Sequence, residues 1–155
     1  MRVGLAAAEA LDRFAPEPIR LKWPNDLYID RSKLAGILVE ARWREQSVEW
    51  IAIGLGVNIL PPENISGAAW LEPGTSRIDV LTELVPGLRA AAFDIGPLNE
   101  DELEEFNARD LARGKACTEP ARGWVAGINS DGELLVTIAD SVASFRSGSL
   151  VLESI

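Results

Sequence analysis

A short stretch near the front of the chain combines residue types that could bind an anion and move a proton. It opens with a polar loop, Lys22-Trp23-Pro24-Asn25-Asp26, and Lys33 follows after a turn at 30–32. If Lys33 pairs with Tyr28, Asp26 is its diagonal neighbour on the same face of a hairpin, roughly 7–8 Å away and within joint reach of a small ligand. Such a pair could hold an anionic acyl group and manage a proton. A surface ion pair without a role is the alternative, and the spacing alone favours it, because Lys and Asp are common at turns.

Short strands must position these charges. Residues 19–22 form a strand that enters the loop, and residues 27–29 and 33–42 form the hairpin. Proline fixes its own backbone, and Asn and Asp side chains bond to neighbouring amides, so the loop should be stiff. Residues 48–60 continue as a strand. Their apolar side chains fall on both parities between 51 and 60, which predicts a strand covered on both faces.

The other elements indicate an α+β fold. Amphipathic periodicity predicts helices over 3–14, 76–93 and 99–109, the last two with capping residues Ser76 and Asn99. After Gly114 the pattern changes to short strands with an Asp-Gly turn, which predicts a small β-barrel. We therefore expect a partial catalytic domain over residues 1–112 and a small C-terminal barrel domain over residues 113–155.

Composition excludes several classes of function. The 155 residues carry a net charge of -9, which argues against a nucleic-acid partner. The chain has no histidine, so His-dependent nucleophile pairs and His-bearing metal sites are closed to it, and no metal site is predicted. One cysteine, Cys117, fits a reducing compartment. No apolar stretch approaches the roughly 20 residues of a membrane span, so we expect a cytoplasmic protein without a membrane partner.

Two further motifs are weaker. Gly54-Leu55-Gly56 resembles the start of a dinucleotide-binding loop, but the third glycine is missing and no helix can follow it. Glycines inside a strand more often mark the close approach of a ligand or another backbone. Asn58, at the end of that strand, is either a structural bridge or a ligand contact, and the sequence leaves both open. The five tryptophans are expected to pack in the core or at an edge.

Three motifs in order resemble the biotin protein ligases. They are Lys22-Trp23-Pro24-Asn25-Asp26, then Lys33-Leu34-Ala35-Gly36-Ile37-Leu38-Val39-Glu40, then Ile53-Gly54-Leu55-Gly56-Val57-Asn58. The likeness covers nearly the whole chain. Residues 124–136 look like the family's ending, a small Src-homology-like barrel, and the front part looks like the C-terminal portion of the family's catalytic domain.

The resemblance implies a two-step acyl transfer. Biotin as substrate and ATP with Mg²⁺ as co-substrates give biotinyl-adenylate, and the biotinyl group then passes to a lysine of a biotin carboxyl carrier domain. By this likeness Lys33 and Asp26 are catalytic: Lys33 contacts the carboxylate and phosphate, and Asp26 orients or deprotonates the carrier amine. The residues expected to bind biotin or the adenylate are Lys33, Gly36, Ile37, Leu38, Trp23, Asn25 and Asn58.

One departure from the family is equally informative. Members of the family hold a glycine- and arginine-rich loop in their first half, and this sequence has no such run. We therefore expect a truncated ligase that lacks the N-terminal half, and whose adenylation without phosphate-clamping arginines is severely slowed. A complementing subunit that binds a separate N-terminal ligase half and a non-catalytic remnant that docks a carrier protein are alternatives. A lipoate ligase relative and a homodimer also stay open.

Overall fold

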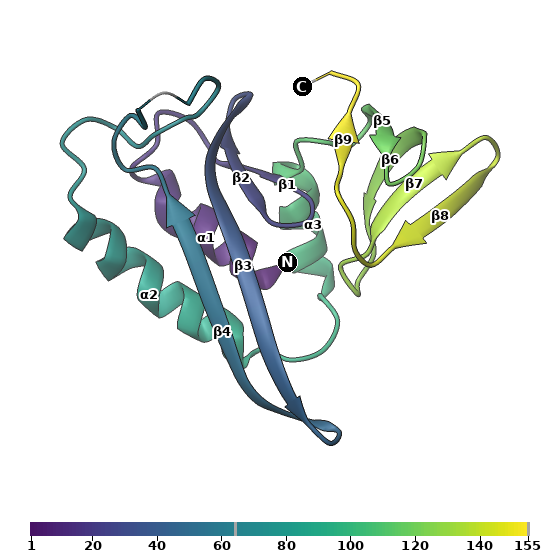
Figure 1. Cartoon of the computed structure of the whole chain (residues 1–155), viewed down its shortest axis with the longest axis horizontal. Coiled ribbons are helices and arrows are strands. Elements are labelled where there is room, and N and C mark those ends of the chain that lie inside the picture. The colour runs from purple at the N-terminus through teal and green to yellow at the C-terminus, as the bar shows by residue number, and fades with distance from the viewer. Residues whose placement is uncertain (64, 155) are drawn as a thin grey trace.

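Two antiparallel sheets and three helices form the fold in the computed structural model, which describes residues 1–63 and 65–154 (Figure 1). The first sheet has the order β1-β2-β3-β4, with β1 Arg20–Lys22, β2 Asp26–Ile29, β3 Ser32–Arg44 and β4 Ser47–Val57. The predicted hairpin is confirmed, and Tyr28 pairs with Lys33, the register on which the diagonal placement of Asp26 was conditional. A register shift after Leu27 accompanies it.

Helices α1, Arg2–Asp12, and α2, Arg77–Phe93, lie on one face of the first sheet (Figure 1). Alternate residues of the strands point into this layer, so Leu27, Ala35 and Ile37 are buried there. As predicted, the Ser76 hydroxyl caps α2 by accepting the amide hydrogens of residues 78 and 79. The helix runs through Pro86 without a break. The two helices cover this face of the first sheet, and the opposite face is its open face.

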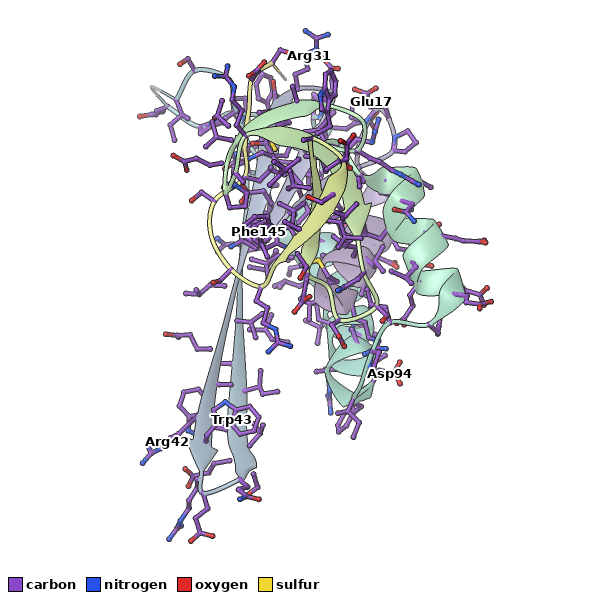
Figure 2. All side chains as sticks on the ribbon, turned by 90° about the vertical axis from the view of Figure 1, so that its right-hand side faces the viewer. Glu17, Arg31, Arg42, Trp43, Asp94 and Phe145 are labelled. Carbon is purple, nitrogen blue, oxygen red and sulfur yellow. The ribbon has the colours of Figure 1, made fainter. Side chains whose placement is uncertain are left out.

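The prediction that residues 51–60 form a strand covered on both faces is wrong. Strand β4 ends at Val57, and the outer part of the β3–β4 hairpin extends beyond the helices, with Trp43 near its tip (Figure 2). Trp50 and Ile51 are 47% and 50% exposed. Apolar residues on both parities indicate double cover only where a second layer is present. In the described residues β4 is also an edge strand of its sheet, as β1 is on the other side.

The second sheet has the order β8-β7-β6-β5-β9. Its strands are β5 Ala116–Glu119, β6 Gly123–Ile128, β7 Leu134–Ile138, β8 Ser141–Phe145 and β9 Val151–Leu152. The sequence missed β5 and β8, because β5 is only four residues long and β8 contains two serines. The α+β class is confirmed, whereas closure into a barrel and a domain boundary near residue 112 stay predictions.

Helix α3, Glu100–Arg109, lies between the two sheets (Figure 1). Asn99 and Glu102 form the capping box that starts it, and Phe106 is buried. One contiguous cluster of buried side chains includes residues of α1, the first sheet, α3 and the second sheet. Both sheets therefore contribute to the same core. Among the described residues, no helix combines the length and apolar character needed to cross a membrane.

Candidate functional site

The Asp26 carboxylate and the Lys33 ammonium form the centre of the candidate site. Nζ of Lys33 lies 2.5 Å from Oδ1 of Asp26, closer than diagonal pairing alone would require. The Asp26 side chain is 18% exposed and the Lys33 side chain 49%. The carboxylate is therefore partly withdrawn from solvent, whereas the ammonium can still reach a molecule that arrives on the open face.

Gly36 forms the floor beneath this ion pair. It pairs with Asp26 in β2 and with Gly56 in β4, which puts the three residues in one cross-strand row. A Cβ atom at Gly36 would lie 3.5 Å from Nζ of Lys33 and 3.6 Å from Oδ1 of Asp26. Gly54 pairs with Leu38, whose side chain is 60% exposed. The open face is thus a strip of backbone bordered by one charged pair and one apolar side chain.

Hydrogen bonds hold the loop that carries Asp26, as its predicted stiffness requires. Nδ2 of Asn25 donates to the Ile37 carbonyl oxygen at 2.6 Å, and the Ile37 amide donates back to the Asn25 carbonyl oxygen at 2.9 Å. Trp23 is 2% exposed, and its indole N–H donates to the Gly132 carbonyl oxygen at 3.1 Å. Trp23 and Asn25 therefore support the site from behind.

The contact to Gly132 links the site to the second sheet. Residues 129–132 form the turn between β6 and β7, and Oδ1 of Asn129 accepts the amides of Asp131 and Glu133. The Gly132 amide donates to the Asn129 carbonyl oxygen at 2.9 Å. This contribution was missed from sequence, since a turn more than 100 residues away carries no local signal of its contact with Trp23.

Asn58 acts as a structural bridge in this arrangement. Its Nδ2 donates to the Ala69 carbonyl oxygen at 3.0 Å and lies 3.5 Å from that of Lys33. The Ala69 amide donates to the same Lys33 carbonyl oxygen at 2.9 Å. Asn58 therefore fixes the backbone at Lys33. Ile37 is also turned away from the open face, because its side chain is buried against α1 near Gly4.

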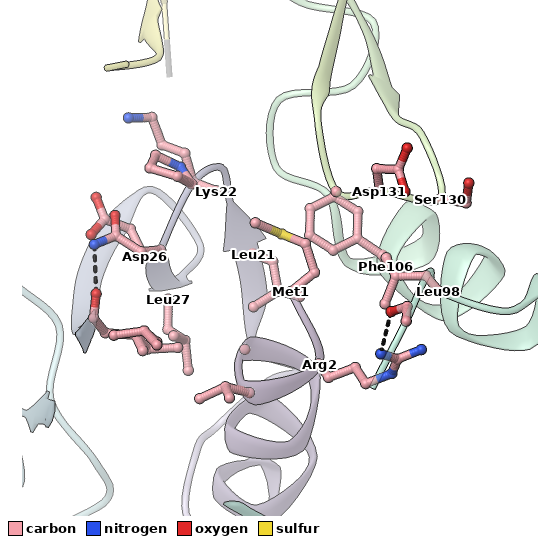
Figure 3. Close-up of a pocket in the computed structure, with 18 residues that line it drawn as sticks. Met1, Arg2, Leu21, Lys22, Asp26, Leu27, Leu98, Phe106, Ser130 and Asp131 are labelled. Atoms are coloured by element: carbon pink, nitrogen blue, oxygen red, sulfur yellow. Dashed lines mark hydrogen bonds between the residues drawn. The ribbon is translucent and has the colours of Figure 1, made fainter. Parts of the chain in front are cut away.

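Lys22 is a second cation beside Asp26 that the sequence did not assign to the site. It pairs directly with Asp26 across β1 and β2, and Figure 3 shows both on the same side of a cavity, away from Phe106. The cavity measures about 360 Å³ and lies between the 22–26 loop, the start of α1 and the 129–132 turn. Burial lowers the pKa of Lys22, an effect that Asp26 opposes and Lys33 reinforces.

Two other features complete the chemistry of the site. Burial raises the pKa of Tyr28, and the negative charge of Asp26 adds to that effect. In residues 1–63 and 65–154, no three His, Cys, Asp or Glu side chains gather so as to hold a metal ion. The arrangement can therefore bind an anion with lysine ammonium groups and accept a proton on a carboxylate.

Comparison with known proteins gives this geometry a context. Residues 1–58 match the biotin/lipoate A/B protein ligase family. The bifunctional ligase/repressor BirA of Escherichia coli is 36% identical over 98% of this chain and 52% of its own length. The biotin–[acetyl-CoA-carboxylase] ligase of Paracoccus denitrificans is 36% identical over 37% of the chain and 23% of its own length. The chain spans about half the length of the BirA proteins that it matches end to end.

Solved structures agree on the fold. The biotin protein ligase of Aquifex aeolicus in its apo form superposes with a TM-score of 0.78, at 22% identity, over 99% of this chain and 73% of that one. The same ligase in complex with biotin and ATP gives a TM-score of 0.75 at the same identity, over 99% and 70%. In sequence and in fold the chain is biotin protein ligase-like.

Proposed function

We propose that this biotin protein ligase-like chain supplies the lysine and aspartate of a site that activates biotin with ATP and transfers it to a lysine of a biotin carboxyl carrier domain. The observation that carries the proposal is the Asp26–Lys33 ion pair above the Gly36 floor. A cation that can reach an anionic ligand there stands next to a carboxylate that can take up a proton. The similarity to BirA over 98% of the chain supports this chemistry.

In the first step the biotin carboxylate attacks the α-phosphorus of ATP, and pyrophosphate leaves with the electrons of the broken P–O bond. Lys33 binds the carboxylate and the phosphate oxygens, so its charge opposes the negative charge that accumulates during the attack. The glycine-rich strip lets the ligand lie against backbone, and Leu38 is its apolar wall. Mg²⁺ arrives with ATP, consistent with its usual binding through substrate phosphates.

In the second step a carrier lysine attacks the acyl carbon of biotinyl-adenylate and AMP leaves. The attacking amine must be neutral, and its nitrogen must lose a proton once the new C–N bond has formed, as AMP leaves and the amide is completed. Asp26 orients this amine and accepts the proton. Asn58 acts at the nucleotide end of the site by holding the Lys33 backbone, as its two side-chain contacts support.

Adenylation by this chain alone is expected to be negligible. The printed sequence contains no glycine- and arginine-rich run to bind the triphosphate, and transition-state charge left in water is poorly stabilised. A separate N-terminal ligase half could supply that run. The exposed β4 edge, with Trp50 and Ile51 half exposed, supports a partner that adds a strand there.

Biotin-dependent exchange of pyrophosphate into ATP tests the proposal. We expect no measurable exchange with the chain alone, and exchange above background when a polypeptide with the glycine- and arginine-rich loop is added. Lys33→Ala should abolish the restored exchange, whereas Arg31→Ala, at the neighbouring turn, should not. Strong exchange by the chain alone would contradict the expected dependence on a partner. Restored exchange that survives Lys33→Ala would contradict the role of Lys33.

The same assay separates the alternatives. A non-catalytic remnant would bind a carrier domain without exchange under either condition. A lipoate ligase relative would show exchange with lipoate in place of biotin. The matched family covers both biotin and lipoate ligases, which is why this alternative is tested. Sedimentation of the chain alone would reveal a homodimer.

A further inference from the structure

Two of the three lysines in this chain flank a single carboxylate. The lysines are Lys22, Lys33 and Lys115, and the first two stand on either side of Asp26. With both ammonium groups charged, the three side chains sum to +1 in a protein whose net charge is -9. Asp26 can neutralise only one of the two lysines. One positive charge is therefore available to an anion on this face.

The two lysines make different contacts. Lys33 contacts Asp26 at 2.5 Å. Lys22 is half-buried and makes no side-chain hydrogen bond or ion pair to any of the residues that the structure describes. Directly paired residues in neighbouring strands lie about 4.5–5.5 Å apart, and a lysine stem is long and flexible. Rotation of its side chain can therefore bring Lys22 to Asp26.

Binding of an anion creates a need for this second cation. If Lys33 turns toward the anion, Asp26 loses its counter-ion, yet its side chain is only 18% exposed. A carboxylate that is neither well solvated nor paired is unfavourable. Other nearby cations are already engaged: Arg20 donates to the carbonyl oxygens of Arg109 and Asp110, and Arg2 pairs with Glu102.

We propose that Lys22 is a positioning residue that serves as the alternative counter-ion of Asp26. When an anionic ligand draws the Lys33 ammonium away, the Lys22 ammonium moves onto the carboxylate. The exchange of partners keeps Asp26 paired while Lys33 binds the anionic ligand. Only the identity of the anion, a carboxylate or phosphate, rests on the proposed function. The exchange of partners itself follows from the positions of the three charges.

NMR of the lysine side chains tests this exchange without any enzymatic activity. With ¹⁵N-labelled lysine the protein gives three Nζ signals, one for each lysine. In the unaltered protein we expect slowed proton exchange at Lys33 and fast exchange at Lys22 and Lys115. In Lys33→Met, the Nζ signal of Lys22 should shift and its proton exchange should slow, while Lys115 is unchanged. Adding Asp26→Asn to that variant should remove the effect.

Titration of the unaltered protein with inorganic pyrophosphate is the second arm. We expect the Lys33 signal to move and the Lys22 signal to acquire the slowed exchange seen in Lys33→Met. A backbone amide spectrum unchanged outside the site establishes that each variant is folded. If Lys22 keeps its fast exchange in Lys33→Met, or if pyrophosphate moves Lys33 while Lys22 stays as it was, the inference is overturned. Neither NMR result depends on biotin. A failure of the proposed ligase activity would therefore leave this inference standing, and the reverse also holds.

Discussion

The bond between Trp23 and the 129–132 turn gives a prediction whose size can be worked from the structure. Trp23→Phe keeps an aromatic ring in a position that is 2% exposed, but it removes the N–H that donates to the Gly132 carbonyl oxygen at 3.1 Å. The Gly132 carbonyl oxygen is part-buried, so leaving it unpaired costs toward the lower end of about 1–3 kcal/mol, and the smaller ring loses part of the roughly 3–5 kcal/mol attached to a full Trp→Ala change. We expect a loss of about 2–3 kcal/mol.

A matched control is available in the second sheet. Trp124 is 60% exposed, so Trp124→Phe should change the free energy of unfolding by less than about 0.5 kcal/mol. Denaturant unfolding measures the free energy of unfolding of both variants. In thermal unfolding, the Tm of Trp23→Phe should be roughly 4–12 °C below that of the unaltered protein. Equal effects of the two substitutions would refute the idea that the turn holds the site loop in place.

Three further predictions concern the central ion pair, its glycine floor and an ion pair at the start of α1. Lys33→Met should lower stability by less than about 1 kcal/mol in denaturant unfolding, because the Lys33 side chain is half exposed and Lys22 can replace it beside Asp26, while removing the restored pyrophosphate exchange. Gly36→Ala should fold normally, since its Cβ makes only ordinary contacts, but Gly36→Val should disturb the ion pair and weaken pyrophosphate binding measured by NMR titration. The pKa of Glu102 is lowered by the Arg2 guanidinium, so its stabilising effect is present above the unfolded value of 4.5 and is lost as pH falls through the lower folded value. Stability of Arg2→Met should therefore fall less steeply with acidification than that of the unaltered protein, as measured by unfolding at a series of pH values.

Local signals in the sequence were sufficient for much of the site. The turn residues and alternating strands predicted the hairpin in which Tyr28 pairs with Lys33, without fixing that register, and the capping residues Ser76 and Asn99 marked the starts of two helices. These features depend on neighbours within a few residues. Strand pairing then brought Asp26 above Gly36, so the central pair was predictable from spacing together with the family resemblance.

Long-range contacts explain what the sequence did not reveal. The cover of β4 depends on which layers lie beside it, and side-chain parity alone predicted cover that is absent around Ile51 in the described structure. The hydrogen bond from Trp23 to Gly132 connects the two sheets, and no periodicity in the sequence predicts it. Lys22 lay within the quoted motif, but its pairing with Asp26 emerged only from the register of β1. Direct contact of Ile37 and Trp23 with a ligand stays a prediction: both side chains are buried, and Ile37 also lines the cavity beside the 22–26 loop.

Calorimetric titration with a non-hydrolysable analogue of biotinyl-adenylate tests the central claim most directly. A charge-assisted hydrogen bond contributes about 1.5–3 kcal/mol, so Lys33→Met should weaken binding by roughly 10- to 150-fold. Arg31→Met removes the same charge from the exposed turn of the same hairpin and should stay within about twofold of the unaltered protein, as expected for a screened surface charge. Equal losses in the two variants, or unchanged binding in Lys33→Met, would contradict the assignment of this face as the biotinyl-adenylate site.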